Sequence, residues 1–346
     1  MRVDLRSDTV TQPTREMREA MLVAEVGDDM SGEDPTVREL EAYCAKLLGK
    51  EASMFVVSGT MGNLICVNAQ TKPGDSIIFE RTSHICNSEA NGYARISGLA
   101  AAPVDGVKGV MPLESVRRAY KPGDLHTPKT GLIAVENTHN LSGGFVMPAA
   151  AMRDIYEFAR SVNIPVHLDG ARIFNAASYL NCDVKELTQY CDTVSMCFSK
   201  GLCAPVGAVV AGTRRFVEKA RGVRKLVGGA MRQAGVLAAP ALVAVRTMRG
   251  RLNEDRRRAV LLGKIFRDAG LQVDQDIQSN IVMVQVPETA GFDARDMVDM
   301  LAAKDVHCLA LSKEQVRLVT HYYIDDAAVE YTARAVKEIF SRRQLI

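Results

Sequence analysis

Aromatic residues are scarce in this sequence. Its 346 residues include 10 Phe, 9 Tyr and no Trp, so few rings are available to stack on nucleic-acid bases or to form a belt at a membrane surface. The 43 basic and 41 acidic residues are interleaved rather than gathered in blocks, and no stretch is basic enough to bind a polyanion. We therefore expect no nucleic-acid partner.

Long hydrophobic runs and closely paired cysteines are also lacking. The longest apolar run, 234–245, is shorter than the roughly 20 residues that span a bilayer, and residues 1–10 have no apolar signal-peptide core. The eight cysteines include no CxxC pair, which is typical of free, buried thiols in a reducing compartment. The sequence thus predicts a cytoplasmic protein with no membrane segment and no metal site.

What the sequence does contain is enough apolar material for a large core. Hydrophobic residues make up 47% of the chain, and its length exceeds the ~250 to 300 residues that one core usually serves. We expect an N-terminal arm over residues 1–12, a large domain over 13–245 and a small C-terminal domain over 246–346.

Short apolar runs alternate with amphipathic segments over most of the large domain. The runs are nearly continuous in Val, Ile and Ala, as in strands covered on both faces, and they cover residues 53–57, 76–80, 131–136, 164–169, 193–199 and 206–211. A helix over 36–48 is marked by Asp34 and Pro35 before it and Gly49 after it. The alternation predicts an α/β domain with a mostly parallel sheet, in which ligands bind at the carboxyl ends of the strands.

The remainder of the chain has a different pattern. A long helix is predicted over 233–268, and it is followed by a strand over 281–286, a helix over 294–304, a strand over 316–320 and a closing helix over 326–342. This order predicts a smaller α+β domain, joined to the first through the long helix.

Three chemical features follow strands of the predicted large sheet. Residues 58–63 open a helix with small side chains, whose backbone amides suit a phosphate, although they match neither glycine-rich nucleotide motif. Asp169 ends a strand and needs a cationic partner there, such as a protonated pyridine nitrogen. Lys200 ends another strand, where its amine is placed to form a Schiff base.

Each feature alone has an ordinary structural explanation. A glycine-bearing turn is as often structural as functional, an Asp can cap the next segment, and a strand-end Lys is usually a surface charge. Together, in this order and at one sheet edge, the three features indicate pyridoxal 5'-phosphate (PLP).

The sequence resembles the threonine aldolase family of PLP enzymes, which has the fold type I architecture of the aspartate aminotransferase class. The matching segments span nearly the whole chain and lie at residues 4–9, 26–29, 32–36, 58–60, 136–140, 169–172, 199–201, 231–233 and 317–321. The resemblance implies a large α/β domain with a mostly parallel sheet and a small α+β domain, with PLP as the cofactor.

The resemblance also implies a role for each matching residue. Lys200 would bind PLP covalently, Asp169 would keep the pyridine nitrogen protonated, and His84 would stack on the ring. The phosphate would be bound by Gly59, Thr60, Lys225 and, from a neighbouring subunit, Arg232. The substrate carboxylate would be held by Ser7, Arg172 and Arg317, with Arg172 also bordering the cofactor.

The implied reaction is retro-aldol cleavage of a β-hydroxy-α-amino acid, of the L-threonine or L-allo-threonine type, to glycine and an aldehyde. The base for the β-hydroxyl is His84, His126 or a bound water. A homodimer is implied at least, and a homotetramer is common in the family. Two alternatives stay open: another PLP reaction, such as β-elimination, transamination or one-carbon transfer to glycine, or a non-catalytic binding protein that keeps the fold.

Three positions depart from the family pattern. Ser31, Asn87 and Ser88 stand where relatives carry aromatic residues near the substrate. We therefore expect these residues to line a pocket for a side chain that is larger or more polar than that of threonine. The alternative is that neighbouring side chains fill the space.

Overall fold

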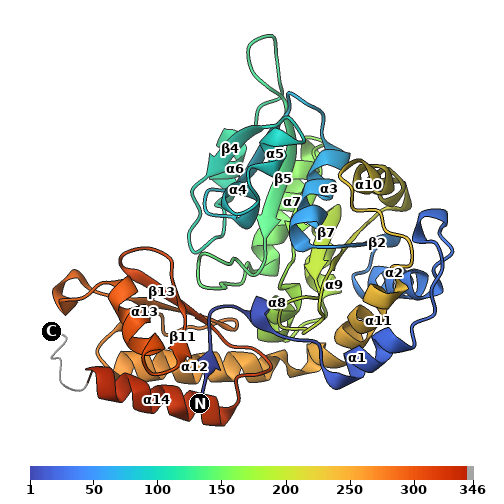
Figure 1. Ribbon diagram of the computed structural model, residues 1–346. Helices are drawn as coiled ribbons and strands as arrows, with labels where there is room; N and C mark the ends of the chain where they lie inside the picture. The colour runs from blue at the N-terminus through green and yellow to red at the C-terminus, as the bar shows by residue number, and fades with distance from the viewer. Residues whose placement is uncertain (341–346) are drawn as a thin grey trace.

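The structure of the protein, a computed structural model, describes residues 1–340. A seven-stranded sheet with its helices forms the larger part, and a four-stranded sheet lies in the smaller part, with helix α12 (Leu252–Asp268) running beneath it (Figure 1). This arrangement agrees with the predicted α/β fold and its smaller α+β part. The exact domain boundaries stay a prediction.

The large sheet is parallel except for one strand. In spatial order its strands are β2 (Ala52–Val56), β8 (Ala208–Gly212), β7 (Thr193–Cys197), β6 (Val166–Asp169), β5 (Thr130–Glu136), β3 (Ser76–Glu80) and β4 (Ala100–Val104). Only β8 runs against its neighbours β2 and β7. All six predicted strands of this domain are present within two residues of their expected bounds, and β4 is the strand that the sequence did not reveal.

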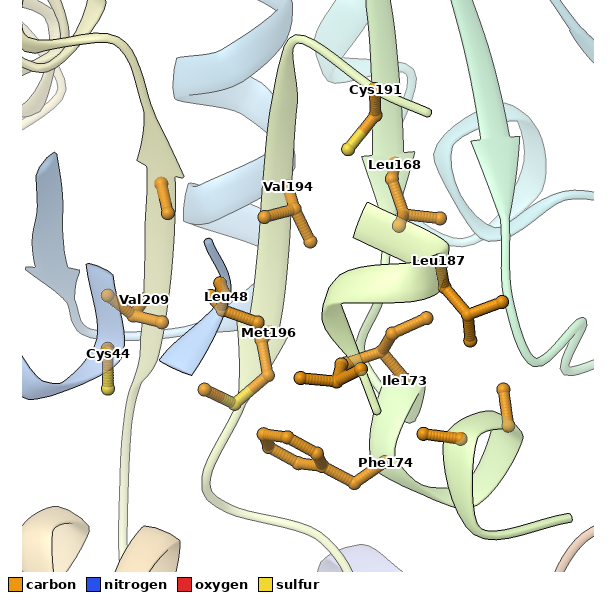
Figure 2. Packing of buried hydrophobic residues seen from close by; sticks show 14 of the residues in the cluster. Cys44, Leu48, Leu168, Ile173, Phe174, Leu187, Cys191, Val194, Met196 and Val209 are labelled. Carbon is orange, nitrogen blue, oxygen red and sulfur yellow. The ribbon is translucent and has the colours of Figure 1, made fainter. Parts of the chain in front are cut away.

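Both faces of this sheet are covered, which explains why its strands lack a polar alternation. In β2, Phe55 packs into the core on one face, while Met54 and Val56 pack into the core on the other. Figure 2 shows part of the first core, where Val194 and Met196 of β7 lie against residues of helices α8 and α9.

The helices of the larger part begin and end largely where sequence signals place them. They are α1 (Arg15–Leu22), α2 (Pro35–Leu47), α3 (Gly59–Gln70), α4 (His84–Asn87), α5 (Gly92–Arg95), α6 (Leu113–Ala119), α7 (Ala149–Ser161), α8 (Ile173–Leu180), α9 (Lys185–Thr188), α10 (Arg214–Leu226) and α11 (Gly235–Val243). In α2 the carboxylate of Asp34 accepts a hydrogen bond from the amide of Val37, and Gly49 beyond its end has a φ of 63°. That N-cap and left-handed glycine confirm the predicted helix.

The long helical stretch predicted over 233–268 is present from Gly235 to Asp268, but it is not one regular α-helix. The segment instead contains α11, a π-helical turn (Ala244–Met248), a 3₁₀ turn (Arg249–Arg251) and then α12. Pro240 lies inside α11 and supplies no amide hydrogen, and Gly250 lies in the 3₁₀ turn. Both residues weaken regular helix, so the chain can change direction here before it enters the smaller part.

The smaller part combines C-terminal elements with the N-terminal arm. Its elements are β1 (Val3–Asp4), α12, β9 (Gln272–Val273), β10 (Ile281–Gln285), α13 (Ala294–Ala302), β11 (Val306–His307), β12 (Leu309–Ala310), β13 (Gln315–Val319) and α14 (Asp326–Phe340). The predicted helices and strands over 281–342 are thereby confirmed, apart from the last two residues of the closing helix, which lie outside the described residues. Strand β1 pairs in parallel with β11, so Val3 and Leu5 join the core of this part. Among the described helices, none has the length and apolar character needed to span a membrane.

Candidate active site

Three of the predicted features, Asp169, Lys200 and the start of α3, lie at the carboxyl ends of the parallel strands. Glu136 and Asp169 are the last residues of β5 and β6 and pair in register, and Lys200 follows the end of β7 by three residues. Helix α3 begins three residues after β2, which runs parallel to these strands. The chain therefore brings an anion-binding helix start, an acid and a lysine to one sheet edge.

The start of α3 is shaped to receive an anion. Ser58 is the N-cap, and its hydroxyl accepts a hydrogen bond from the amide of Met61 at 3.1 Å. The amides of Gly59 and Thr60 have no intrahelical acceptor, and the helix dipole makes this end electropositive. A Cβ atom on Gly59 would lie 2.6 Å from Sγ of Cys197 on β7, so glycine is what lets α3 approach the sheet.

Asp169 is buried and already hydrogen-bonded on both oxygens. Only 3% of the residue is exposed. One carboxylate oxygen accepts a hydrogen bond from Nδ2 of Asn63 at 2.8 Å, and the other accepts one from the amide of Ala171 at 3.1 Å. These two hydrogen bonds fix the orientation of the carboxylate.

A buried histidine fixes the amide of Asn63. Nε2 of His167 lies 3.1 Å from Oδ1 of Asn63, and Nδ1 of His167 lies 3.0 Å from the hydroxyl of Thr193. Burial lowers the pKa of His167 to about 4, so the ring is neutral and its single proton points to Asn63. The NH₂ group of Asn63 is therefore directed at Asp169 and at Glu89, whose carboxylate accepts from it at 2.7 Å.

His84 opens the short helix α4 and is held at two points. Its backbone amide donates to Glu136 at 2.6 Å, and its Nδ1 lies 2.7 Å from Oε1 of Glu89. The hydrogen bond to Glu89 raises the pKa of His84, against the effect of burial, and the negative charge of Asp169 acts in the same direction. One ligand atom each from His84, Glu89 and Asp169 would fit around an ion, all within 4.8 Å of one another, but hydrogen bonds to Asn63 and to each other already occupy this group.

Lys200 lies among the charged groups of the site. Its backbone carbonyl accepts a hydrogen bond from the hydroxyl of Thr11 at 3.0 Å, which ties the lysine to the N-terminal segment. Its ammonium group interacts electrostatically with Asp8, His84 and Cys197. The amine is thus near His84 and near Cys197, which borders the start of α3.

The two arginines predicted to bind a carboxylate are placed differently. Arg172 donates from Nε and Nη2 to Asp8, both at 2.7 Å, and each side chain is buried. Arg317, on β13, donates from Nη1 to Oδ1 of Asn140 at 3.1 Å and from Nη2 to the carbonyl of Arg6 at 3.3 Å. Its Nε is buried and has no hydrogen-bond partner within the described residues.

Burial and the nearby positive charge of Arg172 lower the pKa of Arg317. A buried donor without a partner is costly, and an arriving carboxylate would relieve that cost. Of Arg172 and Arg317, Arg317 is therefore the one with a donor nitrogen available to an anion.

Hydrogen bonds through the segment 136–140 connect His84 with Arg317. Glu136 accepts a hydrogen bond from the amide of His84 through one oxygen and from the amide of Asn140, at 2.7 Å, through the other. Asn140 in turn accepts from Arg317. The buried ring of His139 lies 3.1 Å from a carboxylate oxygen of Glu80.

The described residues fit PLP. The helix start at Gly59 and Thr60 offers unpaired amides for a phosphate, Asp169 offers an ionised carboxylate for the ring nitrogen, and Lys200 offers an amine nearby. Of the other predicted phosphate ligands, Lys225 is exposed near the end of α10, and Arg232 is exposed and pairs with Asp28 at 2.8 Å. A Cβ atom on Gly229 would lie 2.3 Å from Sδ of Met61, so the chain between these two residues passes close to the start of α3.

Four predicted substrate residues do not meet the core of the site in this structure. Ser7 caps a 3₁₀ turn, and its hydroxyl accepts from the amide and hydroxyl of Thr9. The side-chain amide of Asn87 donates to the carbonyls of Arg81 and Ser83. Ser31 and Ser88 are exposed. The backbone amide of Ser88 donates to the carbonyl of His84 at 2.8 Å, but within the described residues no side-chain hydrogen bond links any of the four to His84, Lys200 or Arg317.

The other candidate base, His126, lies away from the site within one chain. It is exposed in the loop between α6 and β5, and its backbone amide donates to Asp124 at 2.8 Å. Figure 1 shows this loop projecting at the far side of the large sheet from the small domain. The loop precedes β5, so it lies at the amino edge of a strand whose other end carries Glu136. A strand of this length separates the two edges by about 20 Å.

Sequence reasoning missed the residues that hold these groups in place. Asn63, Glu89 and Asp8 were given no role, and the segment 136–140 was noted only as part of a pattern. The available signal was weak: Asn63 stands on the helix that follows the phosphate-binding turn, and Glu89 stands five residues after His84.

Comparisons with known proteins agree with the geometry. The family described as Beta-eliminating lyase matches residues 4–289. The chain is 42% identical over 345 residues to the probable low-specificity L-threonine aldolase 2 of Arabidopsis thaliana, with 98% of this chain and 97% of the relative covered. It is 41% identical over 320 residues to the low specificity L-threonine aldolase of Escherichia coli (strain K12), with 92% and 93% covered. Its fold matches the solved threonine aldolase of Leishmania major with a TM-score of 0.83 at 16% identity, with 98% of this chain and 99% of that chain covered.

Proposed function

The chain belongs to the beta-eliminating lyase family, in its threonine aldolase group, and on that premise we propose that Lys200, Asp169, His84 and Arg317 carry out its reaction. The enzyme is a PLP-dependent aldehyde-lyase that splits a β-hydroxy-α-amino acid into glycine and an aldehyde. The observation that carries the assignment of residues is that Asp169 and Lys200 lie at the sheet edge where α3 begins, while Arg317, with an unpaired Nε, interacts electrostatically with Asp8, which also interacts with Lys200.

The coenzyme is held by three groups of the chain. The amides at the start of α3 would bind its phosphate, Asp169 would pair with its ring nitrogen, and Lys200 would hold it through its amine and would be placed to exchange a proton at the substrate Cα. Bound there, PLP supplies a conjugated ring that accepts the electron pair of the Cα–Cβ bond. Asn63 and the amide of Ala171 fix the orientation of the Asp169 carboxylate through hydrogen bonds to its two oxygens.

The substrate is oriented by its carboxylate. Arg317 presents an unpaired Nε, and Asn140 and the carbonyl of Arg6 fix the direction of its guanidinium plane. Anchoring the carboxylate would fix the orientation of the substrate, and thereby which bond at Cα is broken. Arg172 contributes mainly through Asp8, because Asp8 occupies two of its donors.

The proton of the β-hydroxyl passes to His84, directly or through one water. His126 lies at the opposite edge of the sheet in its own chain, so it takes part only if a second subunit supplies it. Arg232 is likewise proposed to bind the phosphate in the site of a neighbouring subunit. We therefore infer that the enzyme acts as a homo-oligomer, a dimer at least and a homotetramer in its full form, in the cytoplasm.

We propose that the substrate has a larger or more polar side chain than threonine. Ser31, Asn87 and Ser88 leave small or polar groups on the exposed segments around α4 and before α2. The side-chain NH₂ group of Asn87 donates to the backbone carbonyls of Arg81 and Ser83. The side-chain oxygen of Asn87 is therefore the atom that remains available to a ligand. These small or polar residues support a site with an open entrance, rather than a closed pocket that fits only the methyl group of threonine.

The test is turnover of paired threo and erythro β-hydroxy-α-amino acids of increasing side-chain length, with the aldehyde trapped and glycine measured. Equal amounts of aldehyde and glycine are expected, with a longer or polar substrate preferred. A keto acid and ammonia instead would show β-elimination, the alternative that the family description favours. A preference for threonine or allo-threonine over every longer analogue would contradict the substrate proposal alone.

A further inference from the structure

The buried carboxylate of Glu89, to which the proposed reaction gives no role, contacts the ring of His84. Oε1 of Glu89 lies 2.7 Å from Nδ1 of His84, and Glu89 is only 8% exposed. The same oxygen accepts a hydrogen bond from Nδ2 of Asn63. The other ring nitrogen of His84, Nε2, makes no hydrogen bond within the described residues, and 29% of the side chain is exposed.

This geometry selects one form of the imidazole. An ionised carboxylate only accepts hydrogen bonds, so Nδ1 of His84 must carry a proton. The neutral ring then has its lone pair on Nε2, the nitrogen without a partner. His84 is thus held in the tautomer that can take a proton at Nε2.

The charged groups around His84 act in both directions on its affinity for a proton. Glu89 and Asp169 are the anions near the ring, Lys200 is the cation, and Glu136 accepts from the backbone amide. The hydrogen bond to Glu89 raises the pKa of His84, with Asp169 adding to it and burial and Lys200 opposing it. Burial and the charge of Asp169 raise the pKa of Glu89 as well, so the two groups titrate as a pair.

Asn63 explains why two acids can stand so close together. Its one NH₂ group donates to Glu89 at 2.7 Å and to Asp169 at 2.8 Å. Without it the two buried carboxylates would repel each other with no donor between them. Asn63 also fixes the direction of Glu89, so that Oε1 faces both the amide and the histidine.

We propose that Glu89 is a positioning residue for the retro-aldol step, which holds His84 with Nδ1 protonated and Nε2 directed at the β-hydroxyl of the substrate. This inference rests on the proposed function. The O–H bond of the substrate breaks and its proton goes to Nε2, the electron pair of that bond forms the C=O bond of the aldehyde, and the Cα–Cβ pair moves to the coenzyme. Glu89 stabilises the imidazolium that results, and the proton returns to solvent after the aldehyde leaves.

The first experiment separates this step from the rest of catalysis with the variant Glu89→Gln. Exchange of the α-hydrogen of glycine with solvent needs Lys200 and the coenzyme but no proton transfer from a β-hydroxyl, so it should be retained. Cleavage of a β-hydroxy substrate should fall about 10²-fold in kcat, within the range for loss of general base catalysis. Glu330→Gln, at an exposed position on α14, is the matched control and should change neither rate. Equal loss of exchange and cleavage would overturn the proposal, because Glu89 would then serve the coenzyme site in general.

The second experiment measures His84 itself, without any turnover. Histidine-labelled protein freed of coenzyme gives NMR signals from its six histidines, and His84→Phe identifies the signal of residue 84. Glu89→Gln should lower the pKa of His84, and Glu89→Asp should give a value between those of the wild type and Glu89→Gln. An unchanged pKa in Glu89→Gln would sink the proposal. If Glu89→Gln does not fold, Glu89→Asp against the wild type decides the same question.

A double-mutant comparison completes the test. In a His84→Phe background, which keeps a ring for stacking, Glu89→Gln should cause no further loss of cleavage because its target is gone. Additive losses would show that Glu89 acts elsewhere. A wild-type enzyme that releases no glycine from any β-hydroxy substrate would instead refute the proposed function, while the His84 titration would still report on the contact with Glu89.

Discussion

Arg172 and Asp8 form a buried ion pair in which two nitrogens of the guanidinium meet two oxygens of the carboxylate, both at 2.7 Å. Asn280 donates a third hydrogen bond to Asp8 at 3.1 Å. The pair joins the N-terminal arm to the end of β6, beside Lys200. Because Asp8 uses the fork that would otherwise bind a planar anion, Arg317 is left as the main anchor for a substrate carboxylate.

Replacing Arg317 with Lys should therefore weaken substrate binding strongly. Lysine keeps the positive charge but loses the free Nε donor and the contact with Asn140. We expect kcat/KM to fall by about 10- to 100-fold, as for loss of a charge-assisted hydrogen bond, and mainly through KM. Steady-state cleavage rates measure this, with the exposed Arg295→Lys as the control. An unchanged KM would assign the carboxylate to another cation.

The Asp8→Asn variant tests the ion pair as a stability element. The change leaves Arg172 charged and buried with no anion opposite, which costs about 3–5 kcal/mol. Urea unfolding of the wild type and the variant at neutral pH should show this loss as a lower midpoint with an unchanged slope. A variant as stable as the wild type would mean that solvent reaches Arg172.

The same pair predicts how stability depends on pH. Burial alone would raise the pKa of Asp8, but Arg172 holds that pKa well below its usual range. A carboxyl group with a depressed pKa in the folded state stabilises the fold above its unfolded pKa of about 3.9, and the contribution is lost as the pH falls below that value. The unfolding free energy of Asp8→Asn should therefore decline less steeply than that of the wild type between about pH 5 and pH 2.

The features of the site that could be predicted from sequence are those tied to strand ends. Asp169 and Lys200 each close an apolar run, and a parallel sheet brings such ends to one edge. The groups that hold them were not predictable in this way, because Asn63 and Asp169 are 106 residues apart and a lone Asn or Glu has no periodicity of its own. Their contacts depend on how α3 and α4 pack on the sheet.

Two features depend on contacts that sequence patterns do not report. The role of His126 stays a prediction, because a residue that precedes β5 lies at the amino edge of the sheet in its own chain and only a second subunit could bring it to the site. The stretch over 233–268 is helical, but its composition did not reveal the π-helical turn and the 3₁₀ turn in its middle.

The close approach of α3 to the sheet predicts that a substitution at Gly59 is harmful and that a second substitution, at Cys197, partly compensates for it. In Gly59→Ala the new Cβ would lie 2.6 Å from Sγ of Cys197, so the start of the helix must move away from β7. We expect a loss of about 1–3 kcal/mol in unfolding free energy and weaker PLP binding, measured by reconstitution of the coenzyme-free protein. The double variant Gly59→Ala with Cys197→Ala removes the sulfur and should recover part of both losses. Equal defects in the single and double variants would contradict this account of the contact.

Glu136 provides the last prediction, because its side chain links His84 to Asn140 and Arg317. Its two oxygens accept from the amides of His84 and Asn140, and Asn140 orients Arg317. In Glu136→Gln one oxygen becomes an NH₂ group, which faces an N–H donor and cannot accept from it. We expect KM to rise and kcat to fall together, each by about 10-fold, which matches loss of one hydrogen bond to a charged group.

The measurement is cleavage kinetics together with a combination of Glu136→Gln and Arg317→Lys. If Glu136 acts on the substrate carboxylate through Asn140 and Arg317, the double variant should lose less in KM than the two single variants combined. Glu114→Gln on the exposed face of α6 is the control. Fully additive effects on KM would show that Glu136 supports only His84. The hydrogen bonds through Asn140 would then make no contribution to substrate binding.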